Sequence, residues 1–488
     1  MNSLQRISLP ALLSIAFMSL PAQLFAQDAT NGGTSPRPTD PQNSAASQEP
    51  SSPAEVGSTP PSIVGPPPSS TGWYDPALSE RLQTMRVKSW GPDGSLASFG
   101  DNLLGNAGGV RSTLADYGIA GIIFVSGVQW QNLLNSPTKT NGSQAYIGQK
   151  YTATSIDGII GTYDMSHIGL TGGQIVVDGG CSVSSYLPAY ARGCRFFNLA
   201  FNYSLFHGRV DLNVGILDNN YSFVDTYVGG STQTGSFGPS ANLQAQSGLS
   251  YEPGSAPGLN VTYHFDSNWY DKIGVQRSVS PQGLVQEYTY YNPHGTTFTE
   301  PNAKALVIDE VGFRQIATAD TLFTYIRGGG LYNWSQYTDF NTRGTDTNWN
   351  AYLLADQQLS RPDPGRAYRG WYAGLSVMES PPNVDVFRNY FEARVYNLGP
   401  FKSRPGDAFN IVATYSEFSS YARQYYIEQL GLYPPQKNTT SLNMSYAWHV
   451  LPGTYVIPGL GFTNHPSFIT APGQGHDLNF FLSFGSYL

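Results

Sequence analysis

The chain has 488 residues and a net charge of −8 without a basic stripe, which argues against a nucleic-acid-binding protein. Only 12% of the residues are charged, about half of the usual share of roughly 25%, whereas 13% are aromatic and 53 are glycine. This composition fits a membrane β-barrel with a half-apolar wall and a neutral-polar lumen. It also fits a secreted β-solenoid or a sugar-binding β-protein.

The N-terminal part of the chain is typical of an exported protein. Residues 1–26 resemble a secretory signal peptide, with a basic Arg6, an apolar run and a cleavage site after Ala26. Residues 27–72 are rich in Pro and Ser, so we expect a disordered tether that buries little apolar surface. Since no later stretch has 18 consecutive apolar residues, no transmembrane helix is expected.

Two short helices are expected before the first strand. Residues 73–98 form a linker in which Leu78, Leu82 and Met85 recur at helical spacing. A second helix is expected from about Gly109 to Tyr117. We assign residues 99–488 to one β-barrel domain.

Beyond residue 118 the pattern has a period of two, which indicates strands with one apolar and one small polar face. Aromatic residues lie near the ends of these segments, as in the girdles of membrane barrels. A soluble sandwich would show the same alternation, but with shorter strands. The clearest examples are Arg209 to Ile216, Leu259 to Phe265, Trp371 to Met378 and Leu442 to Trp448.

The last eleven residues form a strand that would suit a wall between lipid and water. Leu478, Phe480, Leu482 and Phe484 share one face, and smaller or polar residues dominate the other. Residues 100–488 comprise 389 positions, and a barrel hairpin with its loop takes about 45–50, which predicts ~16 antiparallel strands. A barrel of that size has room for a water-filled lumen.

Cys181 and Cys194 bracket a short segment, and in an exported protein they predict a disulfide. No His lies nearby, so a metal site is not expected there. The sequence also lacks a Gly-x-Ser-x-Gly elbow, a phosphate-binding glycine loop and a His-Glu-x-x-His motif. We therefore expect neither enzyme nor cofactor, although carboxylates alone leave a glycosidase open.

Four motifs follow one another along the chain: Gly100-Asp101 with Gly108-Gly109-Val110-Arg111, Asn292-Pro293-His294-Gly295-Thr296, Ala355-Asp356-Gln357 and Arg404-Pro405-Gly406-Asp407. In this order they resemble the carbohydrate-selective porin (OprB-type) family of Gram-negative outer membranes. The resemblance covers roughly residues 99–488, and Pro293 stands where the family's second motif has arginine.

The resemblance implies a porin that passively admits small neutral solutes, in particular monosaccharides such as glucose. Its partners would be sugars and outer-membrane lipids, and the protein would be a monomer or a homotrimer. Asn213 and Asn260 stand where the family commonly has arginine, which predicts a less charged pore. The inward faces of the strands and the second expected helix give the expected pore-lining residues: Asn198, Asn202, Asn213, Asn260, His264, Glu310, Arg314, Glu392, Arg394 and Arg111.

Each of these residues also has a structural interpretation. The Glu/Arg pairs and the asparagines could form ladders that hold neighbouring strands together, and Arg111 could tie its helix to the wall. Two further functions stay open: a general diffusion porin without sugar selectivity, and a secreted β-rich carbohydrate-binding protein or glycosidase.

Overall fold

The computed structural model describes residues 75–90, 99–138, 144–186, 192–226, 228–229, 236–237, 242–430, 435–468 and 475–488. The expected signal peptide and tether, residues 1–26 and 27–72, lie outside the described residues. Within the described residues, no helix is both long and apolar enough to cross a membrane.

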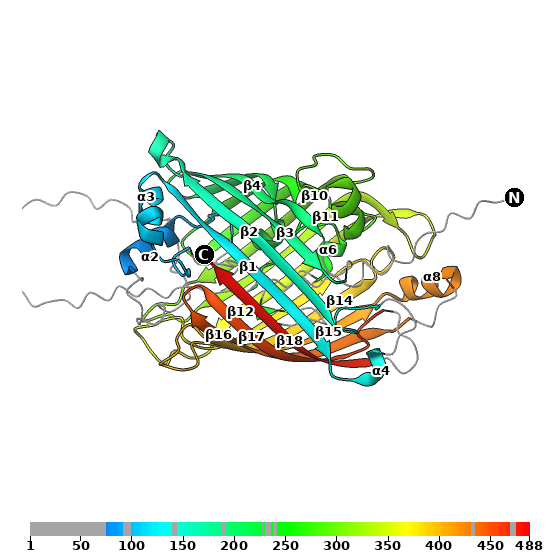
Figure 1. Cartoon of the computed structure of the whole chain (residues 1–488). Coiled ribbons are helices and arrows are strands. Elements are labelled where there is room, and N and C mark those ends of the chain that lie inside the picture. The colour runs from blue at the N-terminus through cyan, green and yellow to red at the C-terminus, as the bar shows by residue number, and fades with distance from the viewer. Residues whose placement is uncertain are drawn as a thin grey trace, which may run out of the picture.

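Sixteen antiparallel strands form a closed barrel, which confirms the fold class and the strand number predicted from the sequence. Each strand pairs with its neighbours in chain order, and Figure 1 shows the strands inclined across the barrel. The strands are β1 (Ile119–Asn132), β2 (Thr152–Asp164), β3 (Gly173–Ser184), β4 (Gly193–Leu205), β5 (Val210–Leu217), β8 (Ala256–His264), β9 (Trp269–Arg277), β10 (Ala305–Gln315), β11 (Thr324–Thr338), β12 (Thr345–Gln358), β13 (Gly370–Glu379), β14 (Phe387–Leu398), β15 (Ala408–Phe418), β16 (Asn438–Leu451), β17 (Thr454–Asn464) and β18 (His476–Tyr487).

The barrel closes where β18 pairs with β1 over nine residue pairs, from Phe124 with Tyr487 to Asn132 with Asn479. At this seam Phe484 lies opposite Gly127, where an added Cβ would come within 2.7 Å of the phenyl ring. The glycine therefore gives the aromatic ring room to lie flat against the outer wall. As the sequence predicts, the face with Phe484 points outward and the face with Tyr487 points inward.

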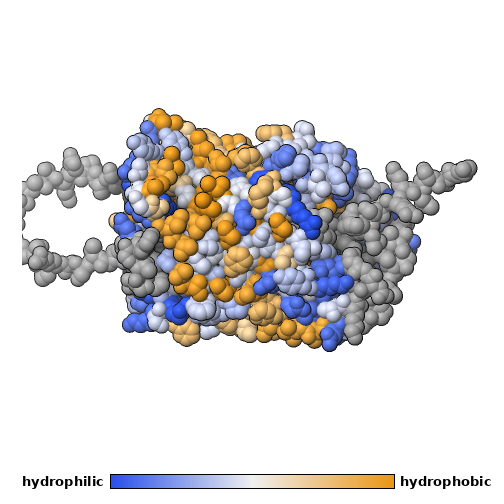
Figure 2. Space-filling model, viewed as in Figure 1, coloured by the Kyte–Doolittle hydropathy of each residue, from blue (hydrophilic) through white to orange (hydrophobic). Residues whose placement is uncertain are grey.

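The outer wall is apolar, as a lipid-facing surface requires. Figure 2 shows hydrophobic side chains spread over the side of the barrel, with hydrophilic ones scattered among them and gathered toward the ends. Aromatic residues project outward near both ends, for example Trp269 and Trp448 at one end and Trp334 at the other. The exposed aliphatic residues between them include Ile123, Ile159, Leu259, Ile273, Leu353, Leu375 and Leu442.

The two ends of the barrel differ in their connections. One end has short turns, such as Pro452-Gly453 between β16 and β17, and it also holds the C-terminus and two helices, α2 (Pro76–Thr84) and α3 (Val110–Asp116). The opposite end has long loops with α4 (Asn135–Thr138), a π-helical turn η5 (Glu287–Tyr291) and α8 (Ser420–Leu430). In outer-membrane barrels the short turns face the periplasm and the long loops face the exterior.

One long connection does not stay outside. The segment between β5 and β8, residues 218–255, is buried along its described parts, and we call it the constriction loop. It contains α5 (Asn219–Phe223), a two-stranded ribbon of β6 (Val228–Gly229) and β7 (Ser236–Phe237), and α6 (Asn242–Gln246). The ribbon contacts β14, β15 and β16. Because the loop starts from β5, it crosses the lumen to the opposite wall.

Candidate functional site

Amide side chains form a continuous ladder on the inner wall. Nδ2 of Asn202 (β4) donates to Gln174 (β3) at 3.1 Å, and Nδ2 of Asn213 (β5) donates to Asn202 at 2.7 Å. Nδ2 of Asn260 (β8) donates to Asn213 at 3.2 Å and to Asn219 of the constriction loop at 2.6 Å.

The ladder ends at β9, where Asn219 Nδ2 donates to Gln276 Oε1 at 2.8 Å. We call Gln174, Asn202, Asn213, Asn260, Asn219 and Gln276 the amide ladder. Its members are at most 7% exposed, so they bond mainly to one another and hold the constriction loop against the wall.

Asn198 also faces inward, but it does not belong to this ladder. It lies opposite Asp178 at a β-bulge, where Phe197 points into the lumen as well. Its side chain is 2% exposed, and its carbonyl oxygen has no hydrogen-bond partner among the described residues. The residue is thus placed on the lumen side but covered.

Glu310 on β10 is held by phenols rather than by Arg314. Tyr270 donates to its Oε1 at 2.7 Å, and Tyr352 donates to its Oε2 at 2.9 Å. The hydroxyl of Tyr270 also contacts that of Tyr325 at 2.9 Å. Charge-assisted hydrogen bonds of this kind are stronger than neutral ones, so the carboxylate stays fixed on the wall.

Two cations of the inner wall hold the constriction loop. Lys272 on β9 donates to the carbonyl of Ser222, and Arg327 on β11 donates to the carbonyl of Asp225. Arg327 also donates to the hydroxyl of Tyr325 at 2.9 Å. Both cations thus fix the position of α5 in the lumen.

Arg394 on β14 is the centre of a buried ionic cluster. Its guanidinium binds Asp356 with two bonds of 2.9 and 2.6 Å and Glu392 with one bond of 2.6 Å. Tyr396 donates to Asp356 at 3.0 Å, and Tyr390 donates to Glu392 at 2.5 Å. One guanidinium thus binds both carboxylates of this part of the wall, and the buried cluster is held together by charge-assisted hydrogen bonds.

A different set of inward residues is half-exposed and therefore open to solutes. His264 Nε2 lies 2.8 Å from Asp211 Oδ2, with side chains 32% and 43% exposed. Lys272 and Arg314 are half-buried on β9 and β10, the next strands along the wall. Arg314 lies 6.0 Å from the ring centroid of Tyr325, and its Nε has no hydrogen-bond partner in the described part of the chain. We call Asp211, His264 and Arg314 the polar wall, because Lys272 already binds the carbonyl of Ser222 in the constriction loop.

Arg111 lies outside this lining and ties α3 to the barrel. Its guanidinium donates to the carbonyls of Phe99 at 2.6 Å, Gly105 at 3.1 Å and Gly121 at 3.3 Å. Burial lowers the pKa of Arg111 to about 10, still well above neutral pH. The geometry matches the structural interpretation of this residue.

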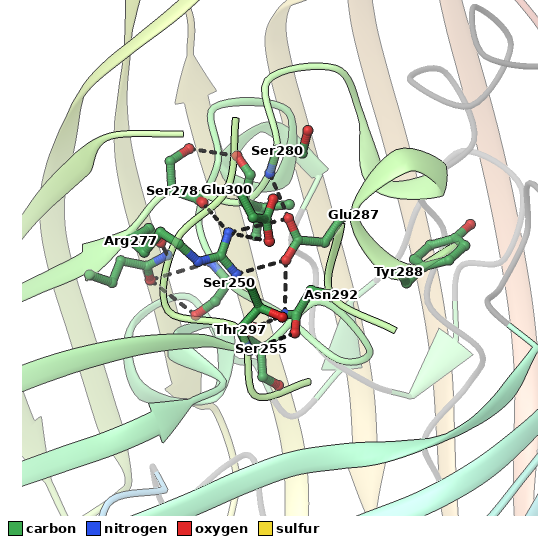
Figure 3. Close-up of polar contacts among 12 residues, drawn as sticks. Ser250, Ser255, Arg277, Ser278, Ser280, Glu287, Tyr288, Asn292, Thr297 and Glu300 are labelled. Carbon is green, nitrogen blue, oxygen red and sulfur yellow. Dashed lines mark hydrogen bonds and ion pairs between the residues drawn. The ribbon is translucent and has the colours of Figure 1, made fainter. Parts of the chain in front are cut away.

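A cluster of polar contacts lies at the long-loop end, where β9 continues into loop 278–304 (Figure 3). Arg277 lies between two carboxyl groups, 2.8 Å from that of Glu287 and 2.6 Å from that of Glu300. Glu287 also accepts from Asn292 at 3.0 Å, which fixes the start of the Asn-Pro-His-Gly segment. Within that segment Gly295 has φ +77°, and a Cβ there would come within 2.1 Å of the carbonyl oxygen of Phe196.

This cluster predicts a pH-dependent loop. Burial, together with the neighbouring Glu287, raises the pKa of Glu300 to about 9. Because the folded pKa lies above the ordinary value, the stabilisation is full in acid and is lost as pH rises through about 9. We expect loop 278–304 to be cleaved several times faster by a protease at about pH 9 than at about pH 6. In Glu300→Gln the cleavage rate should no longer differ between the two pH values. A variant that is cleaved with the same pH dependence as the wild type would contradict the role of Glu300.

Cys181 and Cys194 form a disulfide between paired positions of β3 and β4. Both residues are exposed on the outward face of the wall, away from the lumen. The cross-link therefore joins two strands near the loop that connects them and contributes nothing to the pore lining.

Several inward residues were not among those expected from the sequence: Asp356, Lys272, Arg327, Tyr270 and Tyr352. Asp356 belongs to the Ala-Asp-Gln motif, which could have marked it as the partner of a buried arginine. Lys272 alternates with outward Ile273 and Asp271, so the period of β9 could have placed it in the lumen. For Arg327 the neighbouring run Gly328-Gly329-Gly330 hides the alternation.

The comparisons with known proteins agree with this architecture. The family model described as carbohydrate-selective porin, OprB family, matches residues 161–476. The high-pH structure of Pseudomonas putida OprB is similar with a TM-score of 0.66, and the low-pH structure with 0.50. Each is 15% identical and covers 79% of this chain, and the matches span 97% and 98% of those chains, respectively.

At 15% identity the likeness shows the shared fold, and the family model carries the assignment. A comparison with curated proteins finds no match. The closed barrel with its apolar wall is an outer-membrane protein, and its family is one of channels rather than enzymes. The chain therefore belongs to the OprB family of carbohydrate-selective porins.

Proposed function

We propose that the protein lets small neutral solutes, most readily monosaccharides such as glucose, diffuse passively through its lumen. The observation that carries this proposal is the inward-folded constriction loop, which leaves the half-exposed polar wall as the lining open to solutes. Other charged side chains of the lumen form ion pairs within the wall, as Arg394 does with Asp356 and Glu392. Such a lumen discriminates by size and by weak hydrogen bonds rather than by net charge.

Within the polar wall, we place the sugar contacts on His264 and Arg314. The side chain of Arg314 is half-buried, its Nε is covered and its guanidinium lies 6.0 Å from the centroid of the Tyr325 ring, so its terminal N–H groups are the ones that can meet a sugar. A sugar hydroxyl can accept from the guanidinium while the imidazole and Asp211 offer further partners. The amide ladder keeps a structural role, because its amides are covered and bonded to one another.

The test is single-channel conductance in a planar bilayer with glucose titrated in. We expect the current to fall in a saturable way, because a sugar bound at the polar wall obstructs ions. Arg314→Met should raise the half-blocking glucose concentration roughly tenfold, as expected for a lost hydrogen bond to a charged group. Arg209→Met, at an exposed position before β5, is the matched control and should leave the block unchanged.

A current that ignores glucose in the wild-type channel would refute sugar selectivity and would indicate a general diffusion porin. An equal block in wild type and Arg314→Met would show instead that the sugar binds elsewhere in the lumen. In each case the folded barrel is verified by its heat-modifiable mobility on a gel.

A further inference from the structure

The N-terminal segment before the barrel enters the lumen. Helix α2 begins after Asp75, whose carboxylate accepts from the N–H groups of Ala77 and Leu78, and lies at the short-turn end. The chain then continues from Met85 to Trp90. Four apolar side chains of this stretch are at most 8% exposed, namely Leu78, Leu82, Val87 and Trp90. The segment is therefore packed against the rest of the protein.

Inward-facing side chains of the wall form hydrogen bonds with the backbone of this segment. Thr162 on β2 donates to the carbonyl of Met85 at 2.7 Å. Gln174 on β3 donates to the carbonyls of Met85 at 3.2 Å and Arg86 at 2.8 Å, and it accepts from the N–H of Lys88 at 3.0 Å. Since Thr162 and Gln174 both point into the lumen, residues 85–88 run along the inside of the barrel.

At its far end the segment meets the constriction loop. The rings of Trp90 and Tyr221 lie 5.1 Å apart, and Tyr221 belongs to α5. Gln174, which bonds to the segment, is also the first member of the amide ladder, and the ladder includes Asn219 of the same helix. The N-terminal segment and the constriction loop are thus joined twice, once by ring contact and once through the ladder.

We propose that residues 75–90 form a strap that narrows the short-turn half of the channel and, with the constriction loop, sets the size limit for permeating solutes. The inference rests on the proposed function, because it assumes that sugars cross the lumen. The strap occupies space that an open barrel would leave to water, and Trp90 carries the bulkiest side chain of residues 85–90 to the loop. Deleting the strap should therefore widen the solute path through the lumen and leave the side chains of the polar wall in place.

Liposome swelling with a mono-, a di- and a trisaccharide tests this proposal on the full-length protein. Deletion of residues 75–90 should raise the trisaccharide rate relative to the monosaccharide rate about tenfold, because the narrowest passage governs large solutes most. Trp90→Ala should raise the same ratio by a smaller factor. Glu80→Ala, at an exposed position of α2, is the matched control and should leave the ratio unchanged.

An unchanged ratio in a deletion variant that is still heat-modifiable would overturn the proposal. If the deletion variant fails to fold, Trp90→Ala serves as the test. An unchanged ratio of trisaccharide to monosaccharide rates in that variant would equally overturn the proposal. Failure of the proposed function looks different, because it is a glucose-insensitive current in the wild-type protein. The swelling ratio would still report whether the strap limits solute size.

Discussion

Replacing Arg394 by alanine is expected to destabilise the folded barrel by about 3–5 kcal/mol, the usual cost of removing one partner from a buried ion pair. Asp356 and Glu392 would be left inside the wall, 5% and 3% exposed, without the guanidinium that binds both. The hydroxyls of Tyr396 and Tyr390 would remain, but each supplies only one neutral donor. Urea unfolding of the barrel in detergent micelles measures the loss.

The matched control lies on the same strand. Arg388 approaches Glu417 at 3.9 Å with both side chains about half-exposed, so Arg388→Ala should cost less than about 0.5 kcal/mol. A triple variant, Arg394→Met with Asp356→Asn and Glu392→Gln, should recover much of the loss because no buried charge remains. Equal midpoints for Arg394→Ala and Arg388→Ala would show that the cluster does not stabilise the wall.

Release of the constriction loop should produce the largest change in conductance. In Lys272→Met/Arg327→Met the carbonyls of Ser222 and Asp225 lose their cationic donors, so α5 is no longer fixed. We expect the single-channel conductance to rise roughly twofold or more. The current should also shift toward cations, because Glu310 keeps its charge while two nearby positive charges are gone. Reversal potentials in a salt gradient measure that shift.

Lys402→Met is the matched control, because Lys402 is exposed in the turn between β14 and β15. It removes a positive charge without touching the loop, so conductance and selectivity should stay at wild-type values. If the double variant conducts and selects like this control, the loop is held by other contacts and the two cations are dispensable. The contacts of the constriction loop with β12 and β14 would then be the candidates for holding it in place. One of them is the hydrogen bond from Gln244 to Asn350 at 3.0 Å.

The fold could be predicted from the sequence because the membrane imposes a simple rule on each strand. Successive side chains alternate between lipid and lumen, so Leu259, Val261 and Tyr263 had to face one way and Asn260 and Thr262 the other. The same rule placed Asn202, Asn213, Glu310 and Arg394 on the lumen side. Strand number followed from length, since a strand that crosses the membrane has little freedom in its own length.

The partners of those residues could not be predicted, because they depend on register and on loops. Asn260 bonds to Asn219 through a loop that folds inward, and nothing in the local pattern of residues 218–255 indicates that path. Ser247 of this loop meets Asp385, a residue 138 positions away. Such contacts are fixed by the closed shape of the barrel, which brings opposite walls within reach of one segment.

The pairing of β1 with β18 has a consequence for biosynthesis. Until the last strand is made, β1 and β17 would each present a row of unsatisfied peptide groups, which hydrocarbon does not tolerate. A sealed barrel in the bilayer therefore requires β18 to be present and paired with β1. A chain truncated before His476 would lack β18, so β1 and β17 would keep open edges and the barrel could not seal in the bilayer.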